Sequence, residues 1–188
     1  MDPTVLVIVI VAVVVLAAII GFVAWSAGRK RRTAELKDRF GPEYDRTVER
    51  ADDSRAAEAD LEARRERREE LDIRPLVPAS RDRYLTAWRE VQARFVDSPQ
   101  LAVQQADELV IQVMRERGYP VDDFEQRAAD ISVDHPHLVE TYRQAHRVSV
   151  SNDRGQAETE DLRRAMVHYR NLFEDLLETP DTAGRQAG

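Results

Sequence analysis

Residues 4–27 read TVLVIVIVAVVVLAAIIGFVAWSA and contain no charged side chain. An uninterrupted run of about 18 or more apolar residues is typical of a helix that crosses a membrane. As a helix this run extends roughly 36 Å, enough to cross about 30 Å of hydrocarbon with some tilt. It therefore predicts a transmembrane anchor over residues 1–28, which leaves residues 29–188 to fold in water.

The charges beside this run predict its orientation. Trp25 lies near one end, where an indole ring suits the headgroup region of a bilayer. Directly after the run come four cations, Arg29, Lys30, Arg31 and Arg32. Because the positively charged flank stays on the cytoplasmic side, we expect a single-pass protein of the cell membrane with its N-terminus outside and its C-terminal domain in the cytoplasm.

A cleaved signal peptide is the competing interpretation of the same run. Ala24-Trp25-Ser26 fits the small-x-small cleavage pattern loosely. However, no basic segment precedes the run, and it is longer than the roughly 7–15 apolar residues of a signal peptide. The uncleaved anchor is the favoured interpretation, and a secreted or envelope protein is its alternative.

Small residues recur along one face of the predicted span. They are Ala17, Gly21, Ala24 and Gly28. Spacings of three and four place them on one side of a helix, where small side chains let two helices approach closely. This stripe predicts a homodimer, although Ala and Gly are also simply common in membrane spans.

The composition of the chain excludes several classes of site. Its 188 residues include no cysteine, which excludes disulfides, thiolate metal sites and a cysteine nucleophile. The net charge of −7 argues against a nucleic-acid partner. The seven glycines are never clustered, so a Gly-rich phosphate loop is absent.

Two charged segments follow the predicted anchor. Residues 29–42 form a basic juxtamembrane segment that can continue as a helix until a Gly-Pro pair interrupts it. Residues 43–72 are rich in acids and arginines, and between residues 49 and 70 Leu61 is the only large apolar residue. A coiled coil lacks its apolar positions here. We expect a polar helical stalk of roughly 45 Å, with a disordered segment as the alternative.

Helical spacing of apolar residues resumes beyond a linker at residues 73–79, where prolines favour extended backbone. Residues 80–178 contain five such segments, which makes the chain all-α with a small C-terminal helical bundle. Their predicted starts are Ser80, Ser98, Asp122 or Asp123, the run Asp134-His135-Pro136, and about Ala157. The polar residues 149–156 predict a loop, and residues 179–188 predict a disordered tail.

No group of residues indicates catalysis. The four histidines, His135, His137, His146 and His168, lack the spacing of a metal site. The acids between Asp122 and Asp134 are better explained as helix caps than as an acid–base pair. No serine lies in a nucleophile motif. We therefore expect no catalytic residue, no metal and no cofactor.

Four segments resemble a family of bacterial membrane-anchored proteins that are common in actinobacteria and often labelled hypothetical or secreted. They are Arg39-Phe-Gly-Pro-Glu-Tyr-Asp-Arg46, Leu71-Asp-Ile-Arg-Pro75, Gly118-Tyr-Pro-Val-Asp-Asp-Phe-Glu-Gln-Arg127 and Glu160-Asp-Leu-Arg-Arg-Ala-Met-Val-His-Tyr169. The resemblance covers most of residues 29–178. It implies a bacterial source, an N-terminal anchor and a helical domain, and it implies no activity.

These observations favour a non-enzymatic interaction or adaptor protein held at the cytoplasmic face of a membrane. Its partners would be the lipid bilayer and an unidentified protein. The turn that contains Tyr119, Pro120, Asp122 and Asp123 is the expected protein-binding surface, because it is compact, acidic and aromatic. The alternatives are a small-ligand sensor or enzyme of unknown class, and an exported envelope protein.

Overall fold

The computed structural model describes the backbone of residues 3–178 and the side chains of residues 16–17, 19–23 and 25–178. Within these ranges the chain is all-α, as predicted, with eight helices and no strand. The helices are α1 (Pro3–Phe40), α2 (Pro42–Arg50), α3 (Ser54–Glu70), α4 (Pro78–Arg94), α5 (Pro99–Arg117), α6 (Phe124–Asp134), α7 (Val139–Asp153) and α8 (Thr159–Leu177). The predicted tail at residues 179–188 lies outside the described part.

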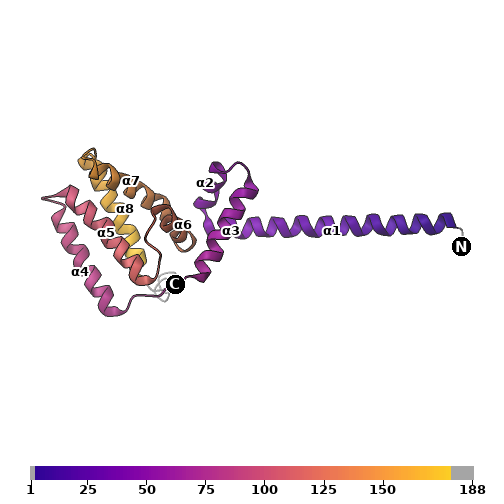
Figure 1. Ribbon diagram of the computed structural model, residues 1–188, viewed down its shortest axis with the longest axis horizontal. Coiled ribbons are helices and arrows are strands. Elements are labelled where there is room, and N and C mark those ends of the chain that lie inside the picture. Colours follow the sequence, from indigo (N-terminus) through magenta and orange to yellow (C-terminus); the bar gives the residue numbers. More distant parts are fainter. Residues whose placement is uncertain (1–2, 179–188) are drawn as a thin grey trace, which may run out of the picture.

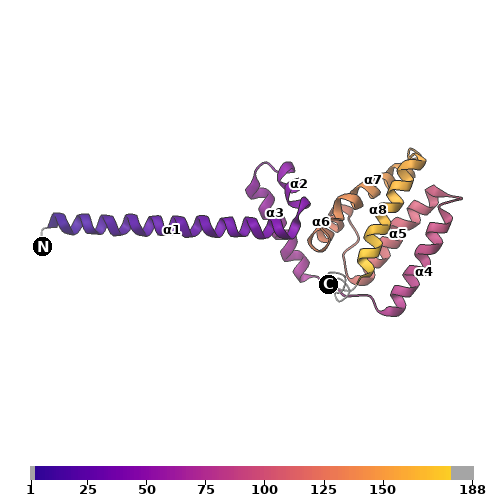
Figure 2. The same cartoon turned by 180° about the vertical axis from the view of Figure 1, so that it is seen from behind.

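Helix α1 is a long rod, and the other helices are gathered at its C-terminal end (Figures 1 and 2). Over the side chains that the structure describes, no helix has an apolar stretch long enough to cross a membrane. Most side chains of the predicted anchor, residues 1–28, lie outside that part. Of the predicted dimer stripe, Ala24 also lies outside it, whereas Gly21 and Gly28 face open space.

The prediction of one extended stalk over residues 43–72 is wrong. Helix α1 ends where Gly41 adopts a positive φ of 46°, and α2 then starts with a proline in its first turn. Helix α3 follows after a short turn and starts at Asp53, whose carboxylate accepts hydrogen bonds from the N–H groups of Arg55 and Ala56. The segment is therefore a hairpin of two helices, which packs beside the end of α1 instead of extending away from it (Figure 1).

A small second core explains why this charged segment folds back. It consists of Leu36, Phe40, Tyr44, Leu61 and Val133. Leu61 is completely buried in it, together with Phe40 at the end of α1. One apolar residue in the middle of α3 is thus sufficient to define a buried face, because the end of α1, Tyr44 of α2 and Val133 of α6 supply the rest of the cluster.

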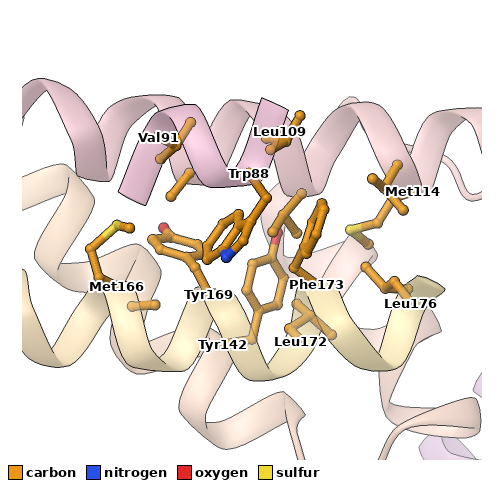
Figure 3. Close-up of a cluster of buried hydrophobic side chains, with 14 of the residues drawn as sticks. Trp88, Val91, Leu109, Met114, Tyr142, Met166, Tyr169, Leu172, Phe173 and Leu176 are labelled. Carbon is orange, nitrogen blue, oxygen red and sulfur yellow. The ribbon is translucent and has the colours of Figure 1, made fainter. Parts of the chain in front are cut away.

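The main core lies in the bundle formed by α4 to α8. Helix α8 packs against α5 and α7, and α4 packs against α5. Figure 3 shows the aromatic side chains at its centre, where the rings of Trp88 and Phe173 stack with centroids 4.7 Å apart. Tyr142 and Tyr169 meet edge to face beside them. The five predicted helices are confirmed, and their apolar stripes form one continuous core.

The linker between the two cores is fixed against the end of α5. The N–H of Arg74 donates to the carbonyl oxygen of Arg117 at 2.8 Å. Next to it, Gly118 ends α5 with a φ of 102°, and a Cβ at this position would collide with the carbonyl oxygen of Asp72. Gly118 is therefore required both by the backbone conformation and by the close approach of the linker.

Three predicted boundaries need correction. Helix α4 begins at Pro78 and not at Ser80, because a proline fits the first helical turn. Helix α7 begins three residues after Pro136, at Val139. The predicted loop at residues 149–156 is helical up to Asp153, because two of its polar residues, Ser149 and Asn152, are buried. The amide of Asn152 donates to the carbonyl oxygen of Gln100 at 2.9 Å.

Candidate functional site

The α2–α3 hairpin meets the bundle through a buried group of ions. Glu43, in the first turn of α2, is 3% exposed, and Arg143 of α7 is 6% exposed. The guanidinium of Arg143 donates two hydrogen bonds to this carboxylate, at 2.7 and 2.8 Å. Arg64 of α3 donates a third, at 2.9 Å. One carboxylate thus holds three helices together.

The electrostatics of Glu43 follow from this geometry. Burial alone would raise the pKa of its carboxyl, but hydrogen bonds and charge from Arg143 and Arg64 outweigh burial, and the pKa lies below its ordinary value of 4.5. Glu43 is therefore ionised at neutral pH and bound to two cations. A buried bidentate pair of this kind fixes orientation as well as proximity.

Further ion pairs extend this contact on both sides. Arg46 of α2 pairs with Glu140 of α7. On α3, Arg67 donates to the side-chain oxygen of Gln126 at 2.7 Å, and Arg68 pairs with Asp134. We call the whole contact between the hairpin and helices α6 and α7 the junction; its residues are Glu43, Arg46, Arg64, Arg67, Arg68, Gln126, Asp134, Glu140 and Arg143.

A cavity of about 350 Å³ opens beside the junction. Its lining includes the side chains of Arg46, Arg50, Arg64 and Arg143 together with Glu43, Asp52, Asp60 and Glu125. Four cations and four carboxylates balance each other, so this cavity does not select for a ligand of either charge. Its lining indicates a structural contact between two parts of the chain, and it contains no group arranged as a nucleophile.

The predicted protein-binding turn contacts the junction through Tyr119. Tyr119 is 3% exposed, and its hydroxyl donates to Asp134 at 2.6 Å, on the carboxylate that also binds Arg68. Burial and the charge of Asp134 raise the pKa of Tyr119. Pro120 is half-buried, whereas Asp122 and Asp123 are exposed. Asp123 caps α6 by accepting a hydrogen bond from the N–H of Gln126. Among the four residues of the predicted surface, only Asp122 is therefore exposed and not part of a helix cap.

Two of the four histidines contact other side chains of the bundle. His135 pairs through Nδ1 with Asp175, and His146 stacks on the ring of Phe124 at 3.6 Å between centroids. Burial lowers the pKa of His146 and of His168. Among the residues with described side chains, no three of the His, Asp and Glu groups lie close enough to hold a metal ion.

Comparisons with family models, with curated proteins and with solved structures found no similar protein. The resemblance to bacterial membrane-anchored proteins is therefore neither supported nor contradicted.

The junction was not predicted from the sequence, although the sequence contains one signal for it. Arg143 follows Val139 by four residues and Tyr142 by one, which places it on the buried side of α7. A charged residue at a core position of an amphipathic helix requires a buried partner. The partner, Glu43, is 100 residues away in the sequence, so the pattern of one helix did not identify it.

Proposed function

We propose that this chain is a membrane-tethered, non-enzymatic interaction protein, in which α1 is the anchor and the bundle is held near the membrane in one fixed orientation. The supporting observation is the surface of α1. Leu16, Ile19, Ile20, Phe22, Val23 and Trp25 are each more than half exposed.

These six side chains are spread over more than half of the helix circumference, since successive residues are about 100° apart. A helix beside a folded domain in water buries one apolar face and exposes polar residues on the other. Exposed apolar side chains over most of the surface instead suit a lipid environment. Together with the uncharged run at residues 4–27, this supports a single-pass anchor.

The basic residues after the run support an orientation with the bundle in the cytoplasm. Arg29, Lys30, Arg31 and Arg32 are all exposed on α1. The junction then supports the second half of the proposal, because a buried bidentate ion pair resists rotation of the bundle relative to α1. A tether with a fixed angle presents the same face of the bundle at the membrane surface in every copy.

The test is the topology of the full chain in cells. The chain has no cysteine, so a single cysteine at Gln156, in the exposed turn between α7 and α8, reports only on the bundle. We expect a membrane-impermeant thiol reagent to label Gln156→Cys only after lysis and Asp2→Cys in intact cells. Labelling of Gln156→Cys in intact cells would reverse the orientation, and recovery of the unlabelled chain in the soluble fraction would refute the tether.

The surface that meets the unidentified protein partner includes Asp122 in this proposal, because Tyr119 is buried and Asp123 is engaged as a cap. A photo-crosslinking residue at Asp122 is expected to capture one defined partner in membranes, and the same residue at Glu158, on an exposed turn, serves as the control. Equal capture at both positions would contradict a binding surface at this turn.

A further inference from the structure

A groove of about 860 Å³ lies between α1 and α3. Its α1 wall consists of Trp25, Gly28, Arg29 and Arg32, and its α3 wall includes Arg55, Glu58, Ala59 and Glu62. Trp25 in its lining belongs to the exposed apolar part of α1. We infer that this groove binds the headgroup of an anionic phospholipid, an inference that rests on the proposed membrane anchor.

Three guanidinium groups from two helices face this groove. Arg29 and Arg32 are three residues apart, on one side of α1. Arg55 comes from the first turn of α3, and so is far from the membrane-flanking cluster in sequence but close to it in space. Within the described part of the chain, none of the three arginines is in an ion pair, which distinguishes them from the arginines of the junction.

Asp53, which caps α3 and does not line the groove, lies near this group of arginines. Backbone N–H groups of Ala56 and Arg55 bind Asp53 and lower its pKa, and the charges of Arg55 and Arg29 lower it further. Arg29 and Arg55 line the same groove, near the end of α3 that Asp53 caps. Planar guanidinium groups match the geometry of phosphate oxygens, so two or three of them from different directions form a phosphate-binding arrangement.

The acids of the groove lie on its α3 wall and are mostly engaged. Glu58 accepts hydrogen bonds from Thr33 and Tyr44, at 2.8 and 3.0 Å, and Glu62 binds Arg65. Glu66 lies three turns beyond Arg55, about 16 Å along α3. Glu58 keeps its negative charge, because both of its partners are neutral hydroxyl groups. The end of the groove near Trp25 is nevertheless net positive, because three arginines line it, Glu62 is paired with Arg65, and Glu66 is distant from Arg55.

Trp25 indicates what else this end of the groove contacts. Its ring is 59% exposed and lies 6.2 Å from the ring of Phe22, one turn earlier on α1. Indole rings of membrane proteins lie at the headgroup level, with acyl chains on their apolar side. A phospholipid with its phosphate between Arg29, Arg32 and Arg55 would place its glycerol and acyl chains along Trp25 and Phe22. This continuity favours a lipid over a free phosphate.

The experiment uses the full chain in vesicles of equimolar phosphatidylglycerol and phosphatidylcholine, with one of the two lipids brominated at a time. Bromine quenches nearby tryptophan, and Trp25 is the exposed one of the two tryptophans, because Trp88 is buried in the bundle. We expect stronger quenching by brominated phosphatidylglycerol. We expect Arg29→Gln or Arg55→Gln to lower the apparent preference about fivefold, the effect of one cation at a membrane surface.

Arg31→Gln is the matched control, because it removes the same charge beside the membrane from a residue that does not line the groove. Equal losses for Arg31→Gln and Arg55→Gln would show diffuse attraction and overturn the site, as would quenching that does not depend on the headgroup. Competition by soluble glycerol phosphate would instead identify a free phosphate ligand and also overturn it. Absence of quenching by either brominated lipid would refute the membrane anchor itself, which is a separate failure.

Discussion

The bundle and the junction hold their helices together in opposite ways. In the bundle, helices α4 to α8 share a continuous apolar core that is centred on stacked aromatic rings. At the junction, the α2–α3 hairpin is held by a small apolar cluster and by a network of arginines and carboxylates. Apolar burial is non-directional and tolerates shifts, whereas bidentate ion pairs specify one geometry but gain little net stability after desolvation. We therefore expect the bundle to determine stability and the junction to determine orientation.

The largest loss of stability is expected when a side chain at the centre of the bundle is truncated. Phe173→Ala removes a completely buried ring that stacks on Trp88. Loss of such a side chain costs about 4 kcal/mol of the free energy of unfolding, because a cavity remains. Thermal unfolding followed by circular dichroism measures this change. Phe22→Ala, at an exposed position on α1, is the control, and equal loss for both variants would contradict a core centred on Phe173.

Removal of the central arginine of the junction is expected to have the next largest effect. Arg143→Met leaves Glu43 buried with one cation instead of two, at a cost of about 3 kcal/mol. We expect this cost to appear as undocking of α2 and α3, measured as faster amide hydrogen exchange there and unchanged exchange in α5 and α8. Arg147→Met, at an exposed position of the same helix, is the control. Faster exchange throughout the bundle would show that the two regions unfold as one.

A substitution next to the linker that joins the two regions should cause a smaller loss of stability. Gly118→Ala places a Cβ at a φ of 102° and against the backbone of Asp72. We expect a loss of about 2 kcal/mol, because a non-glycine residue in this conformation is strained. Gly155→Ala, which has a positive φ but open space around it, separates the conformational cost from the collision. Equal melting temperatures for the two variants would mean that the backbone at Asp72 moves away from the new Cβ at residue 118 without loss of stability.

Acid should loosen the junction before it unfolds the bundle. The pKa of Glu43 is lower in the folded protein than its ordinary value of 4.5. A group with a lowered pKa contributes stability above its unfolded value, and this contribution is lost as the pH falls through the folded value. We expect the protection of α2 and α3 against hydrogen exchange to fall as the pH drops below about 4.5 and through the lowered pKa of Glu43. Glu43→Gln should remove this acid step, and its persistence in that variant would assign the step to another group.

The comparison also explains what the sequence predicts and what it does not. The bundle helices follow from the spacing of apolar residues such as Leu172 and Leu176, because water drives those residues inward whatever their partners are. The junction depends on which arginine meets which carboxylate, and Arg143 and Glu43 are ordinary surface residues by type. The same residue types are present whether Arg143 and Glu43 are separately exposed or buried as an ion pair. Only the tertiary arrangement therefore distinguishes a hairpin that docks through Glu43 from an extended stalk.

The smallest effect on the free energy of unfolding is expected at the turn beside the junction, where one of two neighbouring acids caps a helix and the other does not. Asp123 accepts a hydrogen bond from the N–H of Gln126 at the start of α6, whereas Asp122 is exposed. Asp123→Ala should lower the free energy of unfolding by about 1 kcal/mol, because a backbone N–H loses its cap. Asp122→Ala should leave thermal unfolding unchanged, so any loss of partner capture in that variant reports on binding alone. If Asp122→Ala lowered the free energy of unfolding as much as Asp123→Ala, both residues would stabilise the fold, and a separate binding role for Asp122 would be contradicted.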